Sequence, residues 1–251
     1  MTKKIKILQI NVWGGRIKDG LTDFIAGGDY DVVLMQEAVW GNQDEFLTLF
    51  VDTVDKIKRA AGFEFDFRSS NYGMTLLGGD VRCEYGNAIL SKIPFQETEE
   101  IEVLGEYGCA DGLENYEVAI QNHRYTAQKV VFSDGVVLVN YHGYWLRNPL
   151  GDEVSTDCMR KVADVIRGET RPVVMCGDLN VVAEAPCMRE LDFLTDLTRE
   201  KNVKTTLRNI RFKKDVACDH ILVSNNVKYE DFEVIDAPVS DHRALSVTIE
   251  L

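Results

Sequence analysis

Apolar and polar positions along the chain follow the two periods of regular secondary structure. The closing stretch ALSVTIEL alternates apolar and polar side chains, which is typical of a half-buried strand. Alternation of this kind, or a short apolar run bounded by turn residues, predicts strands at 4–10, 31–35, 63–68, 87–91, 100–104, 116–120, 124–132, 136–141, 172–176, 217–223, 228–235 and 244–251. Apolar residues at helical spacing predict helices at 19–27, 43–61, 155–167 and 187–197.

One turn signal restricts how these strands can be arranged. Asp134-Gly135 separates the strands 124–132 and 136–141, and this dipeptide favours a tight hairpin. A hairpin excludes an all-parallel sheet, so the sequence predicts one or two mixed sheets with interspersed helices. No repeat, low-complexity tract or Pro/Gly/Ser-rich linker marks a boundary, and we expect a single domain over residues 1–251.

Several apolar strands are followed at once by a polar residue. Four runs pass into an amide, a carboxylate or an imidazole: KIKILQI into Asn11, DVVLMQ into Glu37, VVLVNY into His142 and PVVMCG into Asp178. Asn180 follows Asp178 at the next position but one, and Asp241-His242 directly precedes the last strand. A turn explains any one of these residues. Together they indicate that the ends of several strands converge on one site.

The net charge of the chain restricts the kinds of molecule that it is expected to bind. The net charge is −13, whereas proteins that hold a nucleic-acid backbone present a basic surface, so nucleic acid is a disfavoured partner. The charge is also uneven: Ile93–His123 contains eight acidic residues and no Lys or Arg, and Arg199–Lys214 contains seven basic residues and one acidic residue. Two solvated loops of opposite charge explain this contrast, and so does a basic arm beside an anionic substrate.

The remaining bulk features describe an ordinary globular chain. The six cysteines show no CxxC spacing, which argues against a zinc site. No apolar stretch reaches membrane-spanning length, and the first residues pass straight into a strand-like run without a signal peptide. We therefore expect a cytoplasmic, monomeric protein with no membrane insertion.

The chemistry of the gathered groups favours a hard divalent cation. Carboxylate and amide oxygens select Mg²⁺, with Mn²⁺ as a substitute, and Mg²⁺ often completes its shell with substrate phosphate oxygens. Imidazoles beside such a site can donate to phosphate or move protons. The chain has no nucleophile elbow, and its Gly-Gly pair after the first strand lacks the Lys-Ser/Thr of a phosphate-binding loop. Metal-assisted attack of water on a phosphoester is the interpretation that fits.

Seven short motifs together resemble a known superfamily: ILQINVW, LMQEAVW, YGNAILSK, VNYHGYW, CGDLNVV, CDHILVS and VSDHRAL. They occur in the order found in the endonuclease/exonuclease/phosphatase (DNase I-like) superfamily, and the resemblance spans about residues 7–250. It implies a four-layer α/β sandwich, in which two mixed sheets pack face to face with flanking helices outside. It also implies a divalent-metal phosphoesterase whose phosphoester substrate is the partner.

The resemblance also implies roles for individual residues. Glu37 matches the principal metal ligand, Asn11 the amide beside it, and Asp241 a carboxylate near the metal. His142 matches the imidazole that contacts the phosphate, and Asn180 the amide that steadies the phosphorane oxygens. These five residues match the groups that hold the metal and the phosphate.

Five further residues complete the predicted site. Asp178 matches the carboxylate that orients or activates water, and His242 the general base or phosphate donor; which of the two is the base stays open. Asp219 matches the aspartate that hydrogen-bonds the last histidine, the arrangement by which catalytic triads orient a ring. Asn87 lies near the phosphate in some members, although a turn role fits equally, and Tyr144 either stacks on a base or sugar or fills the rim.

The sequence departs from the family pattern in places, such as Gly143-Tyr144-Trp145, where a Leu often follows the histidine. His220 stands in DHILV where Tyr is commoner. Because adjacent residues of a strand face opposite ways, we expect it to face away from a site that Asp219 faces, in packing or at the surface.

Three functions remain after these observations. The favoured one is a Mg²⁺-dependent phosphoesterase acting on a small or nucleotide-like phosphodiester or phosphomonoester. The alternative is an endonuclease or exonuclease on the same scaffold. The third is a catalytically silent module that binds a phosphorylated ligand, which the presence of all matched site residues disfavours. Fold alone does not choose the substrate.

Overall fold

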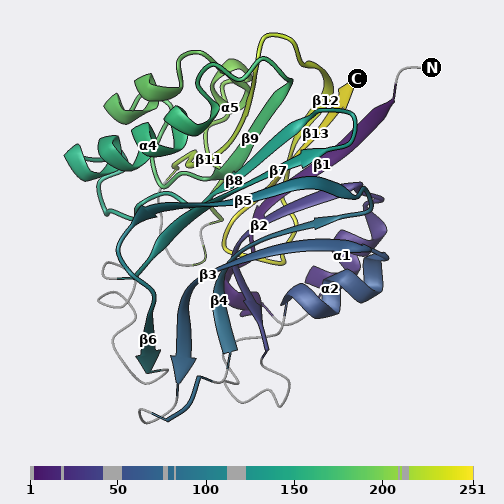
Figure 1. The fold of residues 1–251 in the computed structure, drawn as a ribbon, viewed down its shortest axis with the longest axis vertical. Coiled ribbons are helices and arrows are strands. Elements are labelled where there is room, and N and C mark those ends of the chain that lie inside the picture. Colours follow the sequence, from purple (N-terminus) through teal and green to yellow (C-terminus); the bar gives the residue numbers. More distant parts are fainter. Residues whose placement is uncertain are drawn as a thin grey trace.

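The computed structural model describes residues 3–17, 20–41, 53–75, 79–81, 83–111, 123–208, 210 and 215–250. These residues form two mixed β-sheets with helices on the outside (Figure 1). The predicted strand 116–120 and the first part of the predicted helix 43–61 lie outside the described residues. Among the helices that the structure describes, none is both long enough and apolar enough to span a bilayer.

The first sheet has seven strands in the order β12-β13-β1-β2-β4-β3-β6. The strands are β1 (Lys4–Asn11), β2 (Val32–Trp40), β3 (Phe65–Thr75), β4 (Cys83–Ser91), β6 (Gly108–Asp111), β12 (Lys228–Ile235) and β13 (Ala244–Glu250). The pairs β1–β2 and β3–β6 are parallel, and the other pairs are antiparallel. The last strand therefore lies beside the first, so the segment that precedes β13 ends next to β1.

The second sheet has six strands in the order β10-β11-β9-β8-β7-β5. The strands are β5 (Phe95–Leu104), β7 (Tyr125–Phe132), β8 (Val137–Tyr141), β9 (Val173–Asp178), β10 (Thr195–Asp196) and β11 (Asp219–Val223). The predicted hairpin joins β7 and β8: the N–H of Gly135 donates to the carbonyl of Phe132 at 2.9 Å, and Gly135 has a φ of +85° that suits glycine. Both sheets are mixed, as the hairpin predicted.

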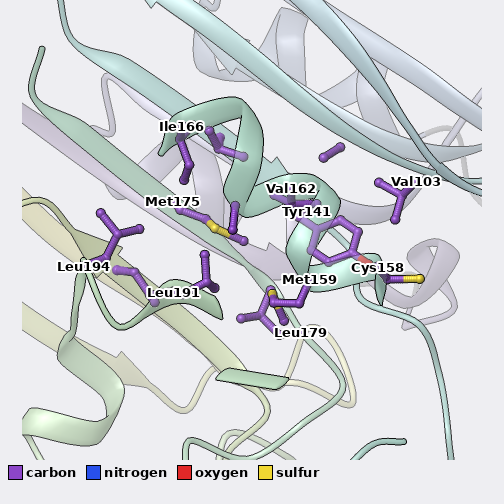
Figure 2. Close-up of a cluster of buried hydrophobic side chains, with 14 of the residues drawn as sticks. Val103, Tyr141, Cys158, Met159, Val162, Ile166, Met175, Leu179, Leu191 and Leu194 are labelled. Carbon is purple, nitrogen blue, oxygen red and sulfur yellow. The ribbon is translucent and has the colours of Figure 1, made fainter. Parts of the chain in front are cut away.

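Helices cover the outer face of each sheet. On the first sheet these are α1 (Leu21–Gly27) and α2 (Thr53–Ala61); on the second they are α4 (Glu153–Ile166) and the 3₁₀ helix η2 (Pro186–Leu191). Figure 2 shows the apolar side chains of α4, such as Val162 and Ile166, packed around Met175 of β9. The order helix, sheet, sheet, helix confirms the four-layer sandwich.

Strand alternation divides the apolar side chains between three layers. On β1, Ile5 and Ile7 lie between the two sheets, whereas Leu8 and Ile10 pack under α1 and α2. Burying each such side chain contributes about 1.5–3 kcal/mol. The core between the sheets is therefore built from one face of each strand, and the polar residues of that same face are fixed in position by it.

The predicted helix 187–197 is wrong in extent. The chain forms η2, then the short strand β10, and only then α5 (Leu197–Glu200). The carboxylate of Asp196 accepts hydrogen bonds from the N–H groups of Thr198 and Arg199 at 3.0 and 3.3 Å, which starts a new helix at that point. Leu191 and Leu194 are buried across the break, which reproduces the apolar spacing of one continuous helix.

Candidate active site

The strand faces that lie between the sheets become polar toward one end. On β1, Gln9 and Asn11 continue the face that begins with Ile5 and Ile7, because alternate residues point to the same side. The residues that continue this face on β2, β8, β9 and β11 are Gln36, Asn140, Asp178 and Asp219, all of them buried. Several strands thus place polar side chains in one layer, as the sequence predicted for the strand ends.

Glu37 reaches this layer through a β-bulge. The pairing of β2 with β4 shifts register just after Met35, and Glu37 has a φ of +52°. Regular alternation would place Glu37 on the face opposite to Gln36, so the bulge redirects its carboxylate. Oε1 of Glu37 accepts a hydrogen bond from Nδ2 of Asn11 at 3.1 Å, and Oε2 accepts one from the hydroxyl of Tyr85.

Asp178 lies between the other groups. Its Oδ2 accepts a hydrogen bond from Nδ2 of Asn11 at 3.0 Å, and its Oδ1 accepts one from the backbone N–H of Asn180 at 3.0 Å. The Nε2 atoms of His142 and His242 lie 3.7 and 3.6 Å from the same Oδ2. Two donors therefore hold a carboxylate that faces two imidazoles.

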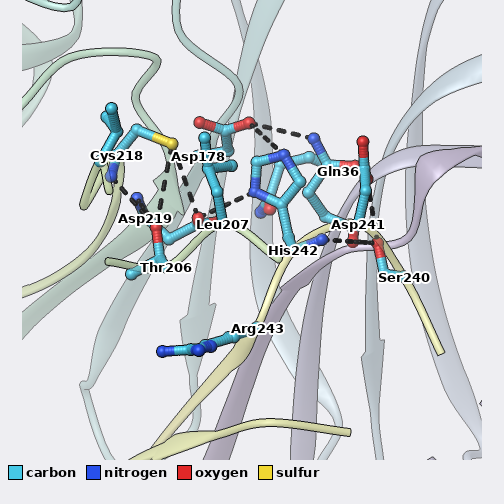
Figure 3. Close-up of polar contacts among 12 residues, drawn as sticks. Gln36, Asp178, Thr206, Leu207, Cys218, Asp219, Ser240, Asp241, His242 and Arg243 are labelled. Carbon is cyan, nitrogen blue, oxygen red and sulfur yellow. Dashed lines mark hydrogen bonds and ion pairs between the residues drawn. The ribbon is translucent and has the colours of Figure 1, made fainter. Parts of the chain in front are cut away.

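His242 is oriented by a buried carboxylate. Its Nδ1 lies 2.8 Å from Oδ2 of Asp219, and the other oxygen of Asp219 accepts a hydrogen bond from Gln9 at 2.9 Å. The hydroxyl of Thr206 accepts the backbone N–H of Asp219 at 3.1 Å, and Figure 3 shows these groups gathered beside Cys218. Because Asp219 occupies Nδ1, the ring presents Nε2 to Asp178.

The charges of this pair stabilise one another. Burial alone would lower the pKa of His242, but the carboxylates of Asp219, Asp178 and Asp241 hold it well above its usual value. Burial alone would raise the pKa of Asp219, yet the neighbouring His242 charge and its hydrogen bonds hold it below the usual value. Both shifts favour the charged forms, a carboxylate beside an imidazolium.

The environment of Asp241 shifts its pKa in the direction opposite to that of Asp219. Burial raises the pKa of this carboxyl to about 6; the nearby His242 opposes that rise, while the charges of Glu37 and Asp178 add to it. The adjacent Ser240 donates its hydroxyl to the carbonyl of Asn11 at 2.6 Å and thereby fastens the loop to β1. Three carboxylates are close enough to affect one another, which a bound cation would relieve.

His142 and Asn180 lie on two loops that touch. Nδ2 of Asn180 donates to the carbonyl of Gly143 at 3.0 Å, and Asn180 has a φ of +56°. Gly143 allows this approach, since a Cβ there would lie 2.1 Å from the carbonyl oxygen of Leu179. Within the described residues, Nδ1 of His142 has no hydrogen-bond partner. His142 is therefore less constrained than His242.

The two predicted substrate contacts, Asn87 and Tyr144, each contact a residue of β7. Asn87 is fully buried, and its Nδ2 donates to the backbone carbonyl of Thr126 at 2.9 Å, which links the two sheets. Tyr144 packs edge-on against Tyr125 with the ring centroids 5.5 Å apart. Their roles as substrate contacts remain predictions.

His220 faces away from the site, as predicted, and it is fully buried rather than at the surface. Its Nδ1 lies 2.9 Å from Oδ2 of Asp196, and its Nε2 lies 2.9 Å from the carbonyl oxygen of Val181. Burial opposes protonation, but the Asp196 carboxylate raises the pKa of His220 above its usual value. The residue thus joins β11 to the start of α5.

Three side chains that the sequence did not single out contact the site: Gln9, Tyr85 and Thr206. Gln9 carried a signal, because it is a polar residue on a strand face that is otherwise apolar. Tyr85 lies two residues before Asn87 in the YGN motif, and Thr206 lies in a segment without a motif. Their contacts depend on tertiary structure and could not be derived from spacing.

The donor set fits a hard cation. Glu37, Asp178 and Asp241 offer carboxylate oxygens within mutual electrostatic range. Asn11 turns its Nδ2 toward the carboxylates of Glu37 and Asp178, while its Oδ1 accepts the N–H of Trp13 at 2.9 Å, so in this orientation its amide nitrogen faces the carboxylates. Its role as a ligand remains a prediction.

A second group could also hold a metal ion. Ligand atoms of Asp178, Cys218, Asp219 and His242 lie within 4.8 Å of one another, all on buried residues. Burial holds the pKa of the Cys218 thiol well above its usual value, and Asp219 already binds His242. A protonated thiol and an engaged carboxylate suit a cation less well than the three carboxylates do.

Comparisons with known proteins identify the family and agree with the fold. A model of the endonuclease/exonuclease/phosphatase family matches residues 8–242. No curated protein sequence matches significantly. A Bacteroides vulgatus endonuclease/exonuclease/phosphatase structure has a TM-score of 0.69 at 18% identity, covering 99% of both chains. ANGEL2, a 2′,3′-cyclic phosphatase, has a TM-score of 0.67 at 12% identity over 100% of this chain and 96% of its own. A Bacteroides thetaiotaomicron mannosyl-6-phosphatase has 0.65 at 14% identity, over 98% of this chain and 99% of its own.

Proposed function

The chain belongs to the endonuclease/exonuclease/phosphatase family of hydrolases that act on phosphoester bonds, and from that premise we propose that it cleaves a small or nucleotide-like phosphoester by metal-assisted attack of water. The observation that carries the proposal is the convergence of two imidazole Nε2 atoms on one oxygen of Asp178, at 3.6 and 3.7 Å. We further propose that residues 1–251 form one domain and that the protein is a monomer.

The two imidazoles have different tasks in this proposal. His242 is fixed by Asp219 as an imidazolium, so its Nε2–H can donate to a phosphoryl oxygen. His142 has a freer ring and supplies a second donor to the same phosphoryl group or its leaving oxygen. Asn180, whose amide is held by Gly143, steadies the remaining oxygens. Together they stabilise the charge that develops on the phosphoryl group.

Water is activated on the carboxylate side. The donors Asn11 and Asn180 hold Asp178 in a fixed orientation, and its Oδ2 faces the two imidazoles. Because His242 is already protonated, Asp178 is better suited than His242 to accept the proton of the attacking water. We therefore assign the general base to Asp178, which is one of the two alternatives that the sequence left open.

The family is generally dependent on a divalent metal, and Glu37 with Asp241 would hold it here. When bound, Mg²⁺ lowers the negative charge on the phosphoryl oxygens and the pKa of nearby water. Tyr85 and Asn11 fix the carboxylate of Glu37 through its two oxygens. Mn²⁺ has the same preference for oxygen ligands and would substitute for Mg²⁺.

A small substrate agrees with the charge of the surface. The net charge of −13 repels a long polyanion. In the basic segment, Arg208 pairs with Asp236 at 2.8 Å and Lys201 with Glu200 at 3.0 Å, which reduces its positive potential. Structural neighbours include a protein named as a 2′,3′-cyclic phosphatase and one named as a mannosyl-6-phosphatase.

A nuclease remains the second candidate because of where the basic segment runs. Leu207 forms a β-bridge with His242, and the N–H of Arg208 donates to the carbonyl of Asp241 at 2.7 Å. The described part of the segment Arg199–Lys214 therefore passes beside the site at Leu207 and Arg208, where it could contact an anionic strand. Residues 209 and 211–214 of this segment lie outside the described residues.

A panel assay tests the proposal. Phosphomonoesters, cyclic and linear nucleotides, small phosphodiesters and DNA are incubated with Mg²⁺, with Mn²⁺ and with EDTA. We expect metal-dependent turnover of a small ester, and full activity in EDTA would contradict the metal mechanism.

A second experiment tests the nuclease alternative: duplex DNA binding is measured by anisotropy with Ca²⁺ across a salt series. A steep decrease of log K, about 0.9 per phosphate contact, from sub-micromolar binding would favour the nuclease. Ligand binding without turnover would favour the silent module.

A further inference from the structure

Beneath the site, four buried amide side chains form a continuous chain of hydrogen bonds across the two sheets. Nε2 of Gln9 donates to Oδ1 of Asp219 and to Oε1 of Gln36, both at 2.9 Å. Nε2 of Gln36 donates to Oδ1 of Asn140 at 2.7 Å, and Nδ2 of Asn140 donates to Oε1 of Gln128 at 2.9 Å. Nε2 of Gln128 donates to a backbone carbonyl of β3 at 2.8 Å.

The four hydrogen-bonded amides lie where apolar side chains would otherwise pack. All four amides have no exposed surface, and they share their strand faces with residues such as Ile7, Leu34 and Leu138. Apolar packing holds two sheets together without fixing the direction of any group. A buried amide is destabilising unless its hydrogen bonds are made, but once made they fix its orientation. The chain therefore adds directional constraint to this end of the core.

The chain of hydrogen-bonded amides reaches two parts of the candidate site. At one end Gln9 donates to the oxygen of Asp219 that does not face His242, so Asp219 is held from both sides. Further along, Gln36 is the residue directly before Glu37 in the bulged part of β2. Its side chain is fixed between Gln9 and Asn140, so the backbone that presents Glu37 is anchored at that point.

We propose that Gln9 and Gln36 are positioning residues: Gln9 holds the carboxylate that orients His242, and Gln36 anchors the bulge that presents Glu37. The proposal deepens the proposed function and depends on it for its effect on turnover. The structural part, an amide that fixes the Asp219–His242 pair, stands without any substrate. Buried partners that orient catalytic or metal-binding groups typically change activity by about 10–100-fold.

The first test replaces Gln9 by methionine, which has a similar shape and no N–H donor. We expect Gln9→Met to lower kcat by about 10–100-fold with little change in KM, because binding groups stay in place. Thr126→Val is the matched control. Thr126 is equally buried in the same layer. Its hydroxyl donates to Asn71 at 3.2 Å and not to one of the four hydrogen-bonded amides. The control should lower stability and leave kcat unchanged.

The second test reads the pair directly in metal-free protein without substrate. The proton on Nδ1 of His242 should give a low-field ¹H NMR resonance that disappears in His242→Ala. Gln9→Met should shift or broaden this resonance, and Thr126→Val should not. An unshifted resonance in folded Gln9→Met would overturn the proposal. A shifted resonance in a protein that hydrolyses no phosphoester would overturn the proposed function instead.

Two further variants keep the inference testable. If Gln9→Met does not fold, Gln36→Met removes the neighbouring link and should move the same resonance less. In an Asp219→Asn background, Gln9→Met should cause no further loss of kcat, because the group that it positions no longer orients the ring. Multiplicative losses of kcat in the double variant would mean that Gln9 does not act through Asp219 and would contradict its role as a positioning residue.

Discussion

The space between the two sheets has an apolar half and a polar half, and most residues of both halves are buried. In the apolar half, residues such as Ile5, Val247 and Val174 pack in a single cluster. In the polar half, the same strand faces carry amides, carboxylates and imidazoles that meet through hydrogen bonds of defined geometry. Burial therefore does not separate the structural core from the candidate site. The kind of contact does.

Backbone strain follows the same division. Six residues other than glycine have a positive φ among those described, and three of them border the polar half: Trp13, Glu37 and Asn180. Each such conformation costs of the order of 1–3 kcal/mol and persists only where the surroundings impose it. The polar half thus combines strained backbone, buried charge and directional hydrogen bonds, whereas the apolar half supplies the stability that sustains them.

The largest expected effect is loss of the Glu37 carboxylate. Glu37→Gln keeps the shape and removes the charge that would bind the metal, so we predict a decrease in turnover of several orders of magnitude, partly restored by high Mn²⁺. Turnover is measured across a metal titration, with Glu64→Gln, an exposed carboxylate on the loop before β3, as the control. Full activity of Glu37→Gln at low metal would show that the polar half does not bind the metal through this residue.

The next effect concerns His242 and Asp219 as a unit. His242→Ala should lower kcat by about 10²–10⁴-fold, the range for a lost proton-transfer group. Asp219→Asn should keep the fold but release the ring from its orientation. Because the residues contact each other at 2.8 Å, the double variant should be little worse than His242→Ala alone. Strictly multiplicative losses in kcat would mean that His242 and Asp219 act independently, and would contradict the view that they form one unit in the polar half.

The sequence predicted the polar half through strand ends. Asn11, Glu37 and Asp178 follow apolar runs, and in a layered fold such ends can meet, so the residue types were visible before the geometry. The alternation of apolar residues also predicted most strands and the hairpin at Gly135. These features are local, since they depend on the period of a strand and on the chemistry of a turn.

What the sequence could not give depends on contacts between distant segments. The bulge that turns Glu37 toward Asn11 breaks the alternation from which its direction would have been inferred. Gln9 and Asp219 are 210 positions apart, and their hydrogen bond follows from how the sheets stack. The order of the strands and the division of 187–197 into three elements likewise reflect tertiary packing and a local cap at Asp196.

A core substitution in the apolar half tests whether that half affects stability without affecting turnover. Ile5 lies on the same strand and the same face as Gln9, and it has no exposed surface. We predict that Ile5→Ala lowers the free energy of unfolding by about 2–5 kcal/mol and leaves kcat of the folded protein close to that of the wild type. Urea unfolding and turnover below the transition measure the two effects. A decrease in kcat as large as that of Gln9→Met would mean that the halves are not separable.

The smallest expected effect is a gain of stability in the polar half. Burial raises the pKa of Asp241 from 3.8 to about 6, so the folded protein binds this proton more tightly than the unfolded chain does. Stability from this group therefore falls as the pH rises from about 4 to 6, and the full cost remains above that range. Asn at this position has no such titration.

In EDTA, Asp241→Asn should therefore be more stable than the wild type at pH 7, by up to about 3 kcal/mol, since each pKa unit corresponds to about 1.4 kcal/mol. The difference should shrink as the pH falls toward 4, where the wild-type carboxyl is protonated in the folded protein and partly protonated in the unfolded chain. Urea unfolding at the two pH values measures it, and an equal difference at both would contradict the linkage. Adding Mg²⁺ at pH 7 should favour the wild type, because the carboxylate that destabilises the empty fold is one that would hold the cation.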